Sequence, residues 1–235
     1  MMYIQGEKRR GLLFLGFVGM VLFAVGDVLL QSFPENGETL LIMLRTSLRE
    51  MPMGRLYFTL LTGALATPCM YFGLCAMDSC LRDYLGDGRG KMYRCFQVGA
   101  VMGMLSFFAA HAVCAVLEMS IKQALECGLS SETVDMAFRT PFLLAFAATN
   151  LWVTVAEVCL SVAYIFYVLK GVLPLPKVAV LLNTAGFYIL FQIVGRILTA
   201  MTGNGIFSLL AKAGASLGVG AMFLAAMHVC RGQRR

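Results

Sequence analysis

The sequence predicts an all-α protein, a polytopic bundle of about six transmembrane helices with both termini in the cytoplasm. Of its 235 residues, 59% are hydrophobic and only 14% are charged, and the mean hydropathy is +0.78. Soluble domains carry about 25% charged residues. Six apolar stretches reach the ~20 residues that a spanning helix needs. The basic residues gather at the ends of these stretches, as in a protein oriented in a bilayer.

The predicted helices follow one another with few residues between them. Turn signals mark the breaks, among them Pro34-Glu35-Asn36-Gly37 after the first helix and Gly203-Asn204-Gly205 before the last. The expected spans are residues 11–31, 57–78, 96–118, 141–169, 176–198 and 206–229. They and their loops use nearly the whole chain. We therefore expect one transmembrane domain over residues 1–235, without a soluble catalytic domain.

The distribution of Lys and Arg predicts the orientation. Both termini, the loop after the second span and the link 170–177 are basic, whereas loops 32–56 and 119–140 balance their basic residues with acids. The positive-inside rule then places both termini in the cytoplasm of a multi-pass plasma-membrane protein. The net charge of +6 indicates contact with anionic lipid headgroups and not with nucleic acid. We interpret the first apolar stretch as an uncleaved span, because it is too long for a signal peptide.

Three further patterns bear on packing. Residues 39–51 fit either an amphipathic helix lying in the membrane interface or an extension of a neighbouring span. Gly99-x-x-x-Gly103 and Gly214-x-x-x-Gly218 allow close helix approach, within one chain or in a homodimer. The eight cysteines form no C-x-x-C pair and are typical of small core residues.

Ionisable residues inside the spans mark the candidate site. Asp27 lies within the first apolar stretch, where a charge is costly and usually functional. With a rise of ~1.5 Å per residue, Asp27 lies ~24 Å and His111 ~22 Å from the inner edge of a core ~30 Å thick, so both fall in its outer half. Glu157 reaches mid-depth on the fourth span. These three residues are the candidate catalytic residues.

Other polar side chains lie at similar or adjoining depths. Facing lipid would cost each of them several kcal/mol, so we expect them to converge with Asp27 on one interior site. His228 lies near the inner end of the last span and is expected at the interface instead. The candidate ligand-binding residues are Thr67, Tyr71, Glu118, Asn150, Gln192 and Arg196.

Short strings in the first three spans resemble a known family. They are Gly26-Asp27 in the first span, Ala66-Thr67-Pro68 in the Gly-rich second span and His111 in the third. They resemble bacterial integral membrane proteins known only as a domain of unknown function, and this resemblance implies a multi-pass fold but no reaction. Many such sequences have a His where Ala76-Met77-Asp78 stands here. Membrane lysoplasmalogenases are also similar in pairing Gly-Asp-x-x-Leu with a later His, although their His follows sooner.

Four functions fit these residues. The favoured one is an intramembrane pocket in the outer half of the bilayer that binds or processes a small amphiphile or lipid. The second is a proton- or cation-coupled transporter of small solutes. The third is a membrane hydrolase, in which Asp27, His111 and Glu157 hold a divalent metal such as zinc or act by metal-free acid–base catalysis; of the two, a site without a cofactor is expected. The fourth is purely structural, with Asp27–Arg196 and His111–Glu157 as buried pairs.

Overall fold

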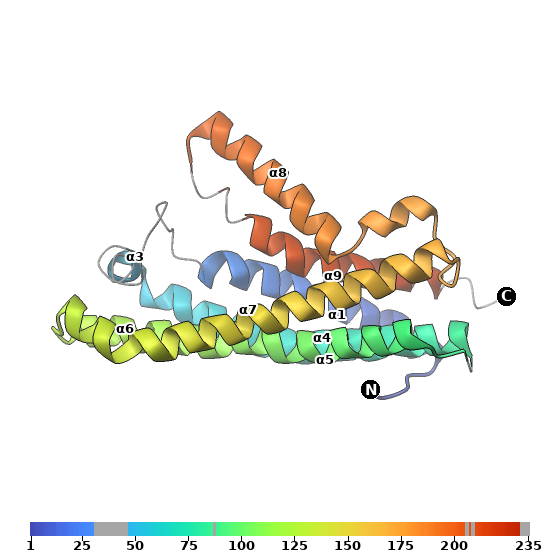
Figure 1. The fold of residues 1–235 in the computed structure, drawn as a ribbon, viewed down its shortest axis with the longest axis horizontal. Helices are drawn as coiled ribbons and strands as arrows, with labels where there is room; N and C mark the ends of the chain where they lie inside the picture. Colours follow the sequence, from blue (N-terminus) through green and yellow to red (C-terminus); the bar gives the residue numbers. More distant parts are fainter. Residues whose placement is uncertain (31–46, 87, 205–206, 208–209, 231–235) are drawn as a thin grey trace.

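In the computed structural model, all regular structure in the described part of the chain is helical (Figure 1). The structure describes residues 1–30, 47–86, 88–204, 207 and 210–230. Its elements are α1 (Gly6–Leu30), α3 (Ser47–Glu50), α4 (Met53–Leu85), α5 (Lys91–Ala109), the π-helical turn η1 (Ala110–Cys114), α6 (Ala115–Glu126), α7 (Ser131–Leu169), the 3-10 turn η2 (Lys177–Leu181), α8 (Thr184–Thr202) and α9 (Leu210–Val229).

Five of these helical stretches are long and apolar enough to cross a membrane. A sixth, Ala213–Val229, is apolar but shorter. This confirms an all-helical membrane protein. The five stretches are Gly6–Leu29, Met53–Leu85, Lys91–Glu126, Ser131–Leu169 and Thr184–Thr202.

Several helix bounds differ from those predicted. Residues 119–140 were expected as a loop, but α6 runs to Glu126 and α7 begins at Ser131, where the Ser130 hydroxyl accepts a hydrogen bond from the Thr133 amide at 3.2 Å. Pro141 therefore lies inside a helix of 39 residues, ~58 Å long. The fifth span begins at Thr184 instead of residue 176, because the Asn183 side chain caps its first turn. Most of the predicted interfacial helix, residues 39–46, lies outside the described residues.

Glycine residues allow neighbouring helices to approach closely. α1 packs on α4 and α9, α5 packs on α7, and α8 packs on α9. A Cβ at Gly99 would lie 2.9 Å from the amide of Leu160 on α7, and one at Gly218 would lie 2.5 Å from the Cα of Thr184 on α8. Both Gly-x-x-x-Gly patterns thus serve packing within the chain, as predicted. Figure 1 shows α8 leaning away from the other helices.

The main core lies between α1, α4, α5, α7 and α9. A smaller apolar cluster, made of Leu48, Ile121, Leu125 and Val134, joins α3 to the α6–α7 hairpin. Figure 1 shows this hairpin at one end of the bundle, and the start of α1 and the end of α9 at the other. We call the second the terminal end.

Candidate functional site

Asp27 and His111 meet inside the bundle. The Oδ1 of Asp27 lies 3.2 Å from the Nε2 of His111, and its Oδ2 accepts a hydrogen bond of 2.5 Å from the hydroxyl of Ser216. The three residues come from the last turn of α1, from η1 and from α9. We call them the Asp27 cluster. The similar depths calculated from the helical rise led us to expect Asp27 and His111 at one interior site, and the two side chains lie in contact there.

His111 is held by the backbones of two other helices. Its side chain is fully buried. A Cβ added at Gly26 would lie 2.7 Å from the Cε1 of His111. A Cβ added at Gly63 would overlap the Cβ of His111. The ring of Phe23 lies on another side, with the two ring centroids 4.9 Å apart. Because α1 and α4 carry glycine at these two positions, there is room for the imidazole. A larger residue at either position would exclude it.

The chain around His111 is a π-helical turn, Ala110–Cys114, between two α-helical segments. A π turn contains one extra residue and breaks the α-helical hydrogen-bond ladder; such turns are frequent at functional sites. The sequence pattern gave no sign of it, because Ala110–Cys114 are apolar apart from His111.

The hydrogen bonding of the cluster is incomplete. Among the described residues, neither ring nitrogen of His111 has a hydrogen-bond partner, although both are buried; the 3.2 Å approach of Nε2 to Asp27 is an ionic contact without hydrogen-bond geometry. Asp27 keeps 19% of its side chain exposed, whereas His111 keeps 1%. The accessible group of the cluster is therefore the carboxylate, and the imidazole supports it from behind.

Two more acids lie near the cluster. Glu157, half-buried on α7, interacts electrostatically with Asp27. Glu118 is 7% exposed and interacts with Arg55. Arg55 in turn donates hydrogen bonds to the carbonyls of Leu29 at 2.5 Å and Val28 at 3.0 Å, and so caps the C-terminus of α1. Three of the predicted acids, on α1, α6 and α7, thus lie at or near this end of α1.

The remaining candidate residues do not converge with Asp27. Asn150 is exposed and donates to the carbonyl of Phe146 within α7. Arg196 is exposed and Gln192 half-buried on α8, which packs mainly on α9. The predicted inward position is therefore wrong for Asn150 and Arg196, because α8 leans outward and Asn150 lies on the outer face of α7. The structural pair Asp27–Arg196 is also wrong, since Asp27 contacts His111 and Ser216.

The last two candidates lie on α4, beyond Gly63. The Thr67 hydroxyl donates to the Gly63 carbonyl at 2.8 Å, one turn away within the helix. Tyr71 is half-buried one turn further, with its ring centroid 5.4 Å from that of Phe72. Both follow the cluster along α4 towards the terminal end, and neither is one of its three contacting residues.

The predicted metal centre lacks a ligand set. Among the described residues, no three His, Cys, Asp or Glu side chains are arranged to hold a metal ion. Asp27 and His111 would supply two ligands, but Glu157 is not placed to supply the third. Structural and catalytic zinc sites use at least three protein ligands.

Sequence reasoning missed two polar neighbours of the cluster. Ser216 is fully buried on α9, and Thr62 lies where a Cβ on Gly26 would meet its hydroxyl at 2.8 Å. Hydroxyl residues are common in transmembrane helices, so nothing in their spacing separates these two from the others. The glycines gave a signal, since Gly26 lies in one of the strings that carry the family resemblance and Gly63 lies in the Gly-rich second span, three residues before another.

A second polar group lies at the terminal end, and each of its charged side chains has a hydrogen-bond or ion-pair partner. Arg9, only 2% exposed, donates to Asp83 at 2.5 Å, to the Ile4 carbonyl at 2.7 Å and to the Tyr3 hydroxyl at 3.1 Å. The Tyr3 hydroxyl donates to Asp83 at 2.8 Å. Nearby, Asp78 accepts from Tyr93 and pairs with Arg82, each at 2.8 Å. We call Tyr3, Arg9, Asp78, Asp83, Arg82 and Tyr93 the terminal-end network.

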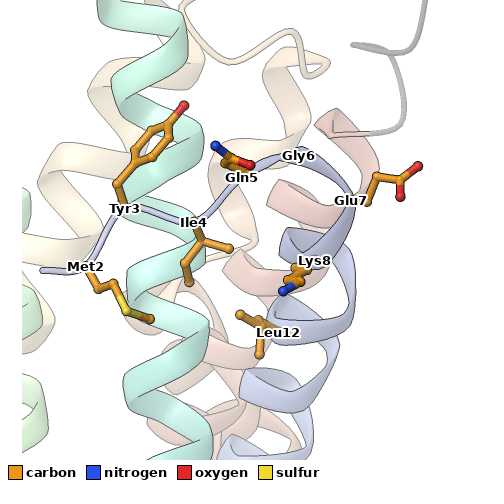
Figure 2. A pocket seen from close by; sticks show the side chains of 8 residues that line it. All are labelled: Met2, Tyr3, Ile4, Gln5, Gly6, Glu7, Lys8 and Leu12. Carbon is orange, nitrogen blue, oxygen red and sulfur yellow. The ribbon is translucent and has the colours of Figure 1, made fainter.

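A hollow of about 620 Å³ lies beside this network, lined by residues 2–8 and Leu12. Figure 2 shows the amino-terminal segment crossing α4 before it enters α1, with Ile4 and Leu12 turned into the hollow and Glu7 turned away. Leu12 precedes Asp27 by fifteen residues of α1, or ~22 Å. The sequence predicted a pocket at the Asp27 cluster. The hollow lies elsewhere and is separate from that cluster.

These features define a multi-helix membrane protein with an acid–histidine pair buried among its helices. The chain belongs to the family of unknown function DUF6796, whose model matches residues 2–233. This agrees with the resemblance to an uncharacterised family. The comparisons with curated proteins and with solved structures found no match.

Proposed function

We propose that this protein is a proton-coupled transporter of small cationic or amphiphilic solutes in the plasma membrane, with both termini in the cytoplasm. Asp27 takes up and releases the proton, and His111 and Ser216 hold its carboxyl group in place. The observation that carries the proposal is the 3.2 Å contact between Asp27 and His111 inside a transmembrane bundle. Intramembrane pairs of acid and histidine are typical of proton pathways in pumps and transporters.

The charge of the cluster favours a cation or a proton over an anion. Asp27 and Glu157 are two carboxyl groups within electrostatic reach of each other, and the basic side chain that contacts Asp27 is the imidazole of His111. A cationic solute competing with the proton for Asp27 would couple the two movements.

Two alternative functions have less support. In a serine hydrolase the hydroxyl contacts the base that activates it, whereas Ser216 donates to Asp27 and His111 faces the other oxygen of that carboxylate. A lipid pocket in the outer half of the bilayer would need a cavity beside Asp27, but the hollow described above lies at the terminal end. Lipid remains the expected partner of the exposed apolar faces of α7 and α8, such as Leu144 and Ile193.

Proton binding can be tested before any solute is known. We would reconstitute the purified protein into liposomes on a solid-supported membrane and measure the transient current after a step to lower pH. The wild type should give a charge displacement, and Asp27→Asn should lose nearly all of it. His228→Gln, at an exposed histidine at the far end of α9, is the matched control and should behave like the wild type. A full-size signal in Asp27→Asn would overturn the proposal.

The same preparation tests the solute class. Tetraphenylphosphonium is a lipophilic cation, and triphenylphosphine oxide is a neutral compound of similar shape. The cation should reduce the pH-step current of the wild type by occupying Asp27, while the neutral compound should leave it unchanged. Equal effects of the two compounds would contradict a cation-selective site.

A further inference from the structure

We propose that Cys80 and Cys230 form a redox-active dithiol, which a peroxide converts into a disulfide that ties α4 to the end of α9. The two sulfur atoms lie 3.1 Å apart, although 150 positions separate the residues in the chain. A disulfide bond is ~2.05 Å long, so each sulfur needs to move by only about half an ångström. The proposal is independent of any transport activity.

The surroundings of the pair favour the thiolate at Cys230, whose pKa is lowered first by its hydrogen bond with the Cys80 thiol and then by the nearby guanidinium groups, against the opposing effect of burial. Cys80 is 1% exposed and Cys230 is 9% exposed, both in the main core. The guanidinium of Arg9 interacts electrostatically with both thiols, Arg10 acts on Cys230, and the opposing carboxylate, Asp83, is already paired with Arg9. A neighbouring cation favours the thiolate, the form that reacts with peroxides.

The reaction balances with a peroxide as the oxidant. The thiolate of Cys230, the more exposed of the two, attacks one oxygen of ROOH; the O–O bond breaks, ROH leaves and a sulfenic acid forms. The thiol of Cys80 then attacks that sulfur, forms the S–S bond and releases water. Together the two thiols lose two electrons and two protons, and ROOH becomes ROH and water.

The crosslink would join two helices that meet only over a small contact. α4 and α9 both pack extensively on α1 but little on each other. Ser216, which bonds to Asp27, lies on the same α9 that the disulfide would fasten. Oxidation would thus fix the helix that carries one member of the Asp27 cluster, whatever that cluster does.

Mass spectrometry of the purified full-length protein tests the proposal directly. After treatment with hydrogen peroxide and blocking of the remaining thiols with N-ethylmaleimide, non-reducing digestion should yield a peptide that links Cys80 to Cys230. Reduction with dithiothreitol should remove it. Cys127 is exposed and serves as the internal indicator that the peroxide has reacted.

Variants define the outcomes. Cys80→Ser should abolish the linked peptide and leave a sulfenic acid on Cys230 that dimedone traps. Cys75→Ser, at a buried cysteine of the same helix, should leave the link intact. If Cys127 is oxidised in the wild type while Cys80 and Cys230 both remain alkylated and unlinked, the proposal is wrong. A link to any other cysteine in place of this one would also overturn it.

Discussion

The terminal-end network and the Asp27 cluster both bury charged side chains between helices, but they differ in how completely those side chains are bonded. Arg9 donates to a carboxylate, a carbonyl and a hydroxyl, and Asp83 accepts from two partners. His111 faces a single carboxylate and, within the described part of the chain, neither of its ring nitrogens has a hydrogen-bond partner. Unsatisfied buried polar groups lower stability, so their presence needs another explanation.

The backbone is regular at the terminal-end network and irregular at the Asp27 cluster. α1 and α4 are regular helices where they carry Arg9 and Asp83, whereas His111 lies in a π turn and against two glycines. Strain and incomplete bonding concentrate at functional sites. The comparison therefore assigns the terminal-end network a structural role, and the incomplete bonding of the Asp27 cluster agrees with the proton site proposed for it.

The largest loss of stability should follow from Asp83→Ala. It removes the carboxylate from Arg9, which is 2% exposed, although Asp83 itself is exposed. Losing a hydrogen bond to a charged group costs about 1.5–3 kcal/mol. For a chain of this size the melting temperature in detergent should fall by about 3–12 °C. Arg94→Ala, at an exposed residue near the same end, should change stability by less than about 0.5 kcal/mol. Equal melting temperatures for the two variants would remove the structural role of the network.

The next largest effect should come from Gly63→Ala. The added methyl group would overlap the Cβ of His111, and overpacking of this kind costs about 1–3 kcal/mol. Gly54→Ala is the matched control, because it lies on the same helix with no atom within 4 Å of the new methyl group; there alanine should be neutral or slightly stabilising. The difference between the unfolding midpoints of the two variants measures how closely α4 packs against His111. If Gly63→Ala is as stable as Gly54→Ala, α4 does not approach His111 this closely.

These contrasts also show how far the sequence could lead. Depth follows from counting residues along a helix, and counting was enough to bring Asp27 and His111 together. Which helices lie side by side depends on loop paths and on small-residue contacts, so the outward lean of α8, and with it the position of Arg196, could not be read from the same count.

The terminal-end network escaped prediction for a different reason. Arg9 and Asp83 look like ordinary interfacial charges in the sequence, since basic and acidic residues are common at helix ends. The burial of Arg9 and its pairing with Asp83 depend on the chain before α1 folding back, so that the Ile4 amide donates to the Ser79 hydroxyl at 2.9 Å. Contacts between residues 75 positions apart leave no periodic signal in either segment.

A smaller stability effect, with a large functional effect, should follow from Asp27→Asn. Asparagine has nearly the same size and keeps an oxygen that accepts from Ser216, so the unfolding free energy should change by no more than about 1 kcal/mol. The pH-step current should nevertheless disappear, because the amide cannot take up a proton. Thermal unfolding and the current should be measured on the same preparation. A loss of stability as large as that of Asp83→Ala would place Asp27 in the structural class instead.

The smallest effect should belong to Arg196→Gln, which separates the two arrangements that have been considered for α8. If the polar residues of all spans converged, removing this charge would leave Asp27 without a cation and would abolish the pH-step current. In the structure Arg196 is exposed, about 9 Å from the end of α8, and a side chain of this length reaches the headgroups. The current should therefore equal that of the wild type, and the unfolding free energy should stay within about 0.5 kcal/mol. Loss of the current in this variant would mean that α8 moves against α7 during turnover and brings Arg196 to the carboxyl groups.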